Sequence, residues 1–276
     1  MDNQILNHWR NLSLSSCSEP YTTVYFWLNN MLLFLTFPTS AIVIVTLLIR
    51  IYGTSCFTPA EVFLLQINFT NISVCISYLL LVLDDINACQ FSMTVFLIFF
   101  SPSLTARPLF MFANCMIFYV AIVHPVTYRT AKTLRHWEWL VSALTWCFAL
   151  IINLAIIIYK IDIFQLGFIM TFYSTILPSM ILYVIILRTL ASVGPGNGGQ
   201  TLNPAKRKAF QIILSILVIT LLYYIPRVLF LVYPYVAPMD WQRFLCAEGQ
   251  VIILLPKVSE IVLPIIILCC LYKVDI

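Results

Sequence analysis

Long apolar stretches separated by short polar segments make up most of the chain. A helix that crosses a hydrocarbon core of about 30 Å needs about 20 predominantly apolar residues. Seven stretches reach that length, near 24–50, 60–83, 91–122, 139–159, 163–190, 208–232 and 247–272. The pattern therefore predicts seven membrane-spanning helices, and the segments that join them are too short to hold a soluble domain.

The amino-acid composition also indicates that most of the chain lies in lipid rather than in water. Of the 276 residues, 62% are hydrophobic and 9% are charged, whereas a soluble domain averages about 45–50% apolar and about 25% charged residues. A transmembrane β-barrel would need about ten-residue segments of alternating polarity and many turns, but the chain shows no such alternation and has only 7 Gly. The predicted fold class is an all-α membrane protein, a seven-transmembrane-helix bundle.

The basic residues predict the orientation. Nine Lys and Arg fall in one set of joining segments and three in the other, and the richer side is cytoplasmic by the positive-inside rule. We therefore expect an extracellular tail over 1–23, a membrane domain over 24–272 and a cytoplasmic tail over 273–276. The outer tail contains the sequon Asn11-Leu12-Ser13, a candidate glycosylation site in this multi-pass protein.

The end of the third apolar stretch suggests a family. Residues 115–128 read CMIFYVAIVHPVTY. This run resembles the rhodopsin-like G-protein-coupled receptors, whose third helix ends in an acid-Arg-Tyr triplet followed by Val/Leu-Ala-Ile/Val-x-His-Pro, and it is most similar to odorant-type and related orphan receptors. Trp146, Pro178, Pro226 and Pro264 fall in register with landmarks of that family. The resemblance implies a plasma-membrane receptor, here of an olfactory type, that binds a small molecule and couples to a heterotrimeric G protein.

Departures from the family pattern support a second hypothesis. Ile117-Phe118 stands where the family has its acid-Arg pair, and only Tyr119 is kept. The chain could then be a signalling-deficient decoy or a subunit of a receptor heteromer. The resemblance implies a G-protein-facing surface made of Phe118, Tyr119, His124, Pro125, Arg129, Lys206, Arg207 and Lys208, although basic inner loops also follow from the positive-inside rule alone.

Ionisable residues within the spans are costly in lipid, so each one suggests a function or a partner. By register, Asn71, Arg107 and Glu260 fall at positions that surround a sodium ion in the family. We expect Arg107 to pair with Glu260 while Asn71 hydrogen-bonds to one of them, so that an internal cation replaces the ion. The alternative is that Arg107 faces lipid and extends toward the interface.

A ligand pocket is expected in the outer half. Arg227 and Lys257 register with pocket positions of the family, as do Tyr223 and Tyr224, and the net positive charge of the spans favours an anionic ligand. Alternatively, Lys257 bonds to Glu260 one turn away and Arg227 extends outward. Lys257 also falls where opsins bind retinal, which leaves an opsin-like protein as a minor hypothesis.

The cysteines divide by depth. Cys17 and Cys246 lie outside and are expected to form a disulfide, as in some related receptors, with Cys17–Cys89 as the rival pairing. Cys75, Cys115 and Cys147 lie within spans and are expected to be small packing residues. The sequence shows no catalytic constellation, metal-ligand spacing or phosphate loop, so we expect neither an enzyme nor a cofactor, and no nucleic-acid partner. A transporter is a further alternative, disfavoured because no inverted repeat is visible.

Overall fold

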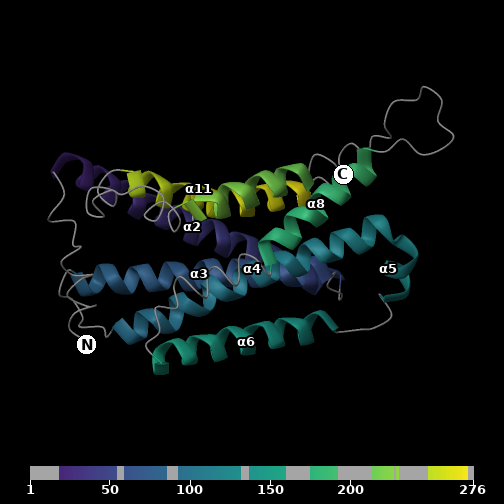
Figure 1. The fold of residues 1–276 in the computed structure, drawn as a ribbon, viewed down its shortest axis with the longest axis horizontal. Coiled ribbons are helices and arrows are strands. Elements are labelled where there is room, and N and C mark those ends of the chain that lie inside the picture. The colour runs from purple at the N-terminus through teal and green to yellow at the C-terminus, as the bar shows by residue number, and fades with distance from the viewer. Residues whose placement is uncertain are drawn as a thin grey trace. The chain divides into compact units, whose positions relative to one another are not determined.

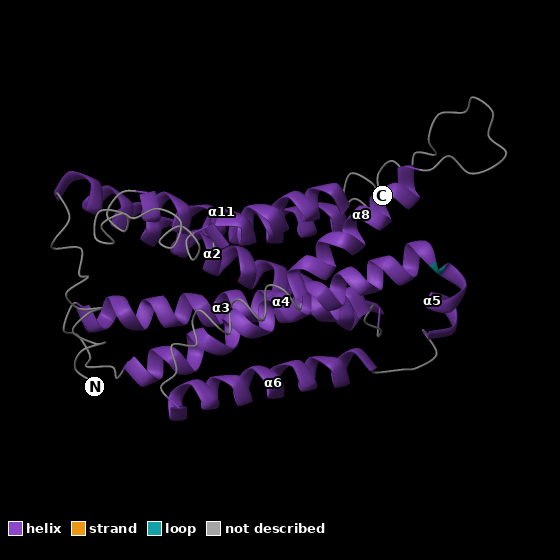
Figure 2. Ribbon diagram, viewed as in Figure 1, coloured by secondary structure: helices purple, strands orange, loops and turns teal. Residues whose placement is uncertain are grey.

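A computed structural model of the chain describes residues 19–54, 59–85, 93–131, 137–159, 175–191, 213–226, 228–229 and 248–272. These residues are helical almost throughout, and no strand occurs among them (Figure 2). The helices are α2 (Glu19–Thr54), α3 (Pro59–Asp85), α4 (Met93–Val123), α5 (Pro125–Ala131), α6 (Trp137–Tyr159), α8 (Leu177–Ala191) and α11 (Glu248–Tyr272) (Figure 1). A further apolar helix covers Ile213–Pro226. The expected all-helical class is confirmed for this part of the chain.

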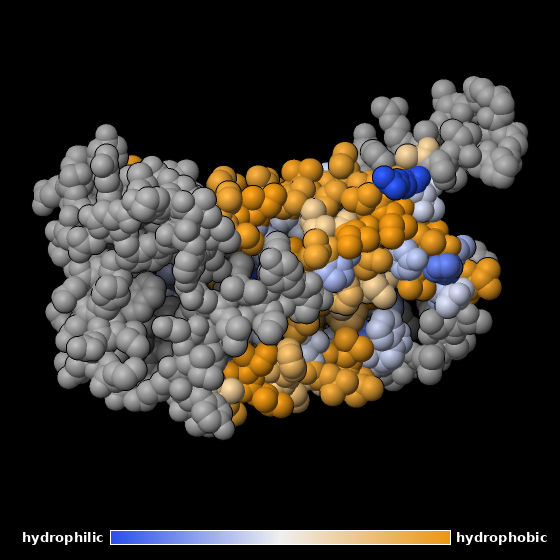
Figure 3. Space-filling model, in the orientation of Figure 1, coloured by the Kyte–Doolittle hydropathy of each residue, from blue (hydrophilic) through white to orange (hydrophobic). Residues whose placement is uncertain are grey.

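Four stretches within these helices are long and apolar enough to cross a membrane. They are Asn30–Arg50, Pro59–Leu80, Thr105–Val123 and Trp137–Ala155, while Leu177–Ala191 and Ile213–Pro226 are apolar but shorter. The described surface is dominated by apolar side chains (Figure 3). Exposed Phe, Leu and Ile are unfavourable in water but suit contact with lipid tails. A membrane protein is therefore the class that the structure supports.

Local sequence explains where several helices begin and how their polar side chains are satisfied. Pro59 and Pro125 occupy the first positions of α3 and α5, where the missing N–H of proline costs nothing. Hydroxyl groups within the spans donate back to carbonyls of the preceding turn, as Thr46 does to Ile42 at 2.8 Å. Such bonds remove unpaired donors from an environment without water.

The chain divides into two compact units, which are described separately. The first contains Met1–Thr36 and Ile219–Leu263, and the second contains Phe37–Val218 and Pro264–Ile276. In the second unit α4 is the central helix, since it contacts α3, α5, α6 and α8. Figure 1 shows α3, α4 and α6 lying alongside one another.

Four aromatic rings join α3, α4 and α6, and we call them the ring ladder. Trp137 of α6 meets the edge of Phe63 of α3, with ring centroids 6.2 Å apart. Phe63 contacts Phe110 of α4 at 6.3 Å, and Phe110 contacts Trp146 of α6 at 5.8 Å. Trp146 also donates from its indole nitrogen to the side-chain oxygen of Gln66 at 2.9 Å. The ladder therefore begins and ends on α6 and fixes that helix against two neighbours.

The C-terminal half of α2 packs on α3 in the same unit. Val43, Ile44 and Leu47 of α2 form a buried cluster with Leu65 of α3. Near the ends of the same helices, Arg50 Nη1 lies 3.6 Å from Glu61 Oε1. Glu61 is in the first turn of α3, where a negative charge also interacts favourably with the helix dipole.

Candidate functional site

Buried amides on α3 are the first component of the candidate site. Asn71 is 0% exposed, and its side-chain nitrogen donates to the Ser40 hydroxyl at 3.3 Å. Asn68 is 1% exposed and donates to the Leu64 carbonyl at 2.8 Å. In both residues the side-chain oxygen is buried and accepts no hydrogen bond. Each such oxygen costs about 1–3 kcal/mol, so the pair calls for a donor such as a water or a cationic side chain.

Two contacts fix the register of α3 against α4. The Ser73 hydroxyl donates to the Phe99 carbonyl at 2.8 Å, and the rings of Phe63 and Phe110 lie 6.3 Å apart. As residue numbers fall along α3 they rise along α4, so the two helices are antiparallel. A step of ten positions from Ser73 back to Phe63 on α3 matches a step of eleven positions from Phe99 to Phe110 on α4.

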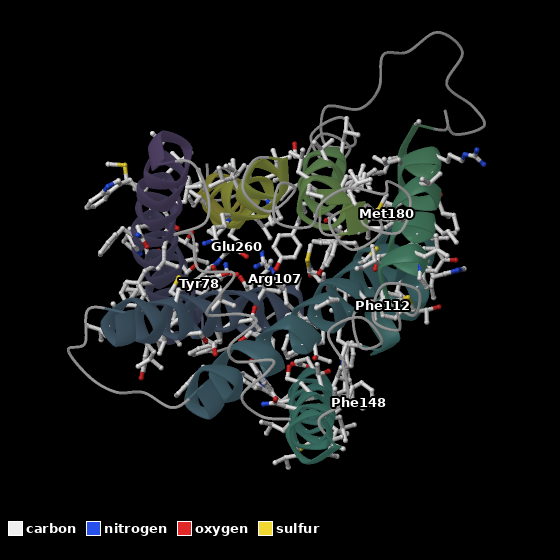
Figure 4. All side chains as sticks on the ribbon, turned by 60° about the vertical axis from the view of Figure 1, so that its left-hand side comes forward. Tyr78, Arg107, Phe112, Phe148, Met180 and Glu260 are labelled. Atoms are coloured by element: carbon white, nitrogen blue, oxygen red, sulfur yellow. The ribbon has the colours of Figure 1, made fainter. Side chains whose placement is uncertain are left out.

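Arg107 lies within this matched stretch of α4 and is 2% exposed, projecting from α4 in Figure 4. Helical side chains tilt toward the N-terminus of their helix, and α4 begins at Met93. The Cα–Cβ bond of Arg107 is therefore tilted from the level of Phe110 toward that of Phe99, which is the end of the matched stretch nearer to Asn71. This burial favours the interpretation in which Arg107 faces other helices rather than lipid.

The first unit contains its own buried polar group. Lys257 and Glu260 of α11 are 5% and 4% exposed, and their three-residue spacing puts them on one face of the helix. Ser259 is also buried and donates to the Pro256 carbonyl at 2.6 Å. Tyr223 and Tyr224 are both buried, with their rings edge to face and 4.7 Å apart.

The predicted ligand-binding and core residues are divided between the two units. Lys257, Glu260, Tyr223 and Tyr224 belong to the first unit, whereas Asn71 and Arg107 belong to the second. The Arg107–Glu260 ion pair therefore stays a prediction. Arg227, Asn11, Cys17 and Cys246 lie outside the described residues.

The predicted G-protein-facing surface is described in part. Phe118 and Tyr119 are half-buried near the end of α4, whereas His124 and Pro125 are exposed. The Tyr119 and His124 rings meet edge to face at 5.6 Å. His124 is the single non-helical residue between α4 and α5 (Figure 2). Backbone hydrogen bonds continue across it, because the His124 N–H donates to the Val120 carbonyl and the His124 carbonyl accepts from the Tyr128 N–H, both at 3.0 Å.

The remaining residues of that surface are basic. Arg129 lies on α5, a short helix that the pattern of apolar residues does not predict. Lys206, Arg207 and Lys208 lie outside the described residues.

Several polar contacts were not expected from the sequence, and one cysteine lies in a different environment from the one predicted. Ser40 and Asn68 were not singled out, although both are polar residues inside apolar runs, which is the signal that could have found them. Cys75 and Cys115 are buried as predicted, but Cys147 is exposed. The packing role assigned to Cys147 is therefore wrong, because this side of α6 is turned away from its helical neighbours.

Metal chemistry receives no support from the described residues, among which no three His, Cys, Asp or Glu side chains are grouped so as to hold an ion. In comparisons with known proteins, no family model matches the chain and no curated protein matches it.

Proposed function

We propose that the chain is a seven-helix receptor of the rhodopsin-like G-protein-coupled class, of an odorant or related type, in the plasma membrane. The observation that carries the proposal is the junction of α4 and α5. The segment that resembles the family lies at the end of a 31-residue helix, and its His124-Pro125 is exposed where the chain turns into α5. An exposed corner of this kind can contact a cytosolic partner.

The count of seven spans is part of the proposal. Four long apolar stretches support it, and the two shorter apolar helices and α11 would be the other three spans. The positive-inside rule puts the N-terminus outside, and the corner at His124 is then cytoplasmic. In this orientation Lys257 and Glu260 lie within the bilayer, where buried ionisable groups mark ligand or ion sites.

A second candidate function is a decoy or heteromer subunit that binds ligand without activating a G protein. Phe118 favours it, because a half-buried phenyl ring at this position can neither donate hydrogen bonds nor pair with an acid. The two functions share one fold and differ only in coupling.

G-protein activation in membranes from expressing cells tests both. Nucleotide exchange would be measured with the unaltered chain and with Phe118→Arg, with Phe118→Leu as the apolar control at the same position. Exchange above that of mock membranes from the unaltered chain supports the receptor and excludes the decoy. Exchange only with Phe118→Arg supports the decoy, and none from any surface-expressed variant overturns both.

We also propose that the ligand is a small anion held by Lys257 and Arg227. A buried lysine ammonium favours a carboxylate or phosphate that replaces its lost hydration. Binding of a panel of short carboxylates to purified protein checks this, with Lys257→Leu and Arg227→Leu as variants. Equal binding by both variants and the parent would contradict the proposal.

A further inference from the structure

The place where α4 meets α8 contains an unusual polar contact. Cys115 of α4 is 0% exposed, and its thiol donates to the main-chain carbonyl of Ser179 of α8, with the sulfur 3.6 Å from the oxygen. The Tyr183 side chain also hydrogen-bonds to Cys115. Figure 4 labels Phe112 on α4, three residues before Cys115, and Met180 on α8, the residue after Ser179.

The backbone of α8 is irregular at the same place. A single π turn at Thr175–Ile176 precedes the helix, and Pro178 has no N–H to donate. The Ser179 hydroxyl donates to the Thr175 carbonyl at 2.6 Å, which supplies a donor to the irregular turn. π turns and prolines are places where a helix can change register or bend.

The buried stripe of α8 changes character along its length. Ser179 and Tyr183 are followed by Ile186 and Leu190, and all four are buried. The apolar half can slide over another apolar surface at little cost, because dispersion contacts are not directional. In the polar half, the Cys115 thiol, the Ser179 carbonyl and the Tyr183 phenol can all bond in only one position of α8 along α4. The polar half therefore sets that position.

We propose that Cys115, Ser179 and Tyr183 form a latch that holds α8 against α4 in the resting state. Opening the latch frees the segment after the π turn to shift along α4. The thiol is suited to this, because a sulfur donor is weaker than a hydroxyl and an interhelical bond within a membrane stabilises by only about 1 kcal/mol. The contact can therefore fix a position and still break on a functional timescale.

Alkylation of the latch thiol tests the proposal without any assumption about signalling. Purified full-length protein in lipid nanodiscs would be treated with N-ethylmaleimide, and labelling at Cys75, Cys115 and Cys147 would be followed by mass spectrometry. In the parent we expect all three thiols to react slowly, because Cys75 and Cys115 are buried and exposed Cys147 lies within an apolar span, where a thiol does not ionise readily. Tyr183→Phe removes one latch bond, so we expect labelling of Cys115 to rise about three- to fivefold.

Thr189→Ala is the matched control, since Thr189 lies further along α8 than the latch and its hydroxyl donates within the helix to the Ile185 carbonyl at 2.9 Å. It should leave labelling of Cys115 unchanged. An unchanged labelling rate of Cys115 in Tyr183→Phe would overturn the latch. An equal rise in the labelling rate of Cys75 would also overturn it, because it would mean that the variant loosens the whole protein.

A second experiment rests on the proposed function. Basal G-protein activation should rise about three- to fivefold in Cys115→Ala, return to the parent level in Cys115→Ser, which keeps a donor, and stay at that level in Cys75→Ala. An active receptor whose basal level does not respond to Cys115→Ala contradicts the latch. Absence of activation in every variant, together with the expected labelling, counts against the receptor function and leaves the latch supported.

Discussion

The two sides of α4 differ in how much aromatic packing joins them to their neighbours. Toward α3 and α6, the ring ladder of Trp137, Phe63, Phe110 and Trp146 makes broad contacts that depend on shape, in addition to the hydrogen bond from Ser73 to the Phe99 carbonyl. Toward α8, the polar contact is a buried thiol on a backbone carbonyl. Aromatic packing is lost only when rings are pulled apart, whereas one weak hydrogen bond breaks and re-forms readily. We infer that α3, α4 and α6 form the fixed part of this unit and that α8 is the part that can move.

The largest effect is expected from a substitution at Phe110, the central residue of the ring ladder. Phe110 is 0% exposed and contacts both Phe63 and Trp146, so Phe110→Ala should leave a cavity and destabilise the protein by about 3–5 kcal/mol. Thermal unfolding in detergent measures the loss. Phe148→Ala is the control, because Phe148 of α6 is 52% exposed and its loss should shift the midpoint little. Equal shifts for the two variants would mean that the ladder does not fix α6.

The predicted core pair should give an effect of similar size. If Arg107 and Glu260 are partners, Glu260→Gln leaves a buried guanidinium without its counter-charge, at a cost of about 3–5 kcal/mol. The double variant Arg107→Met with Glu260→Met should recover most of that loss. A double-mutant cycle by thermal unfolding gives the coupling energy, and additive losses would show that the two residues do not interact.

These residues show how far the sequence alone could go. Apolar run length predicted several of the described helices to within a few residues, as for 60–83 against the observed Pro59–Asp85. Intramembrane polarity singled out Asn71, Arg107, Lys257 and Glu260, all of which are buried. Both results depend on properties that a single residue or a continuous run carries by itself.

The faces of the helices could not be predicted in the same way. Cys115 and Cys147 sit in similar apolar surroundings, yet one is buried and the other exposed. A helix that is apolar all round has no periodic signal to mark its inner side. Gln66 and Trp146 are 80 residues apart, and Cys115 bonds to a main-chain atom, which no residue type reveals.

The hydrogen bond from Trp146 to Gln66 offers a finer test of the fixed side. Gln66→Ala leaves the indole N–H without its acceptor, so we expect a loss of about 1–3 kcal/mol in unfolding free energy. Trp146→Phe removes the donor and keeps an aromatic ring beside Phe110. In that background Gln66→Ala should have much less effect, and an undiminished effect would show that Gln66 stabilises by packing instead.

The ion pair between α2 and α3 should have the smallest effect. Arg50 Nη1 lies 3.6 Å from Glu61 Oε1, and the Arg50 side chain is 32% exposed, so solvent screens much of the attraction. Arg50→Gln should therefore lower stability by less than about 1 kcal/mol, and the difference from the parent should vanish in 1 M salt, where the Debye length falls to about 3 Å. Thermal unfolding at low and high salt measures this. A loss that persists in salt would mean that the Arg50 side chain stabilises the protein through packing. The fixed part of the unit would then include the C-terminal end of α2 as well as α3.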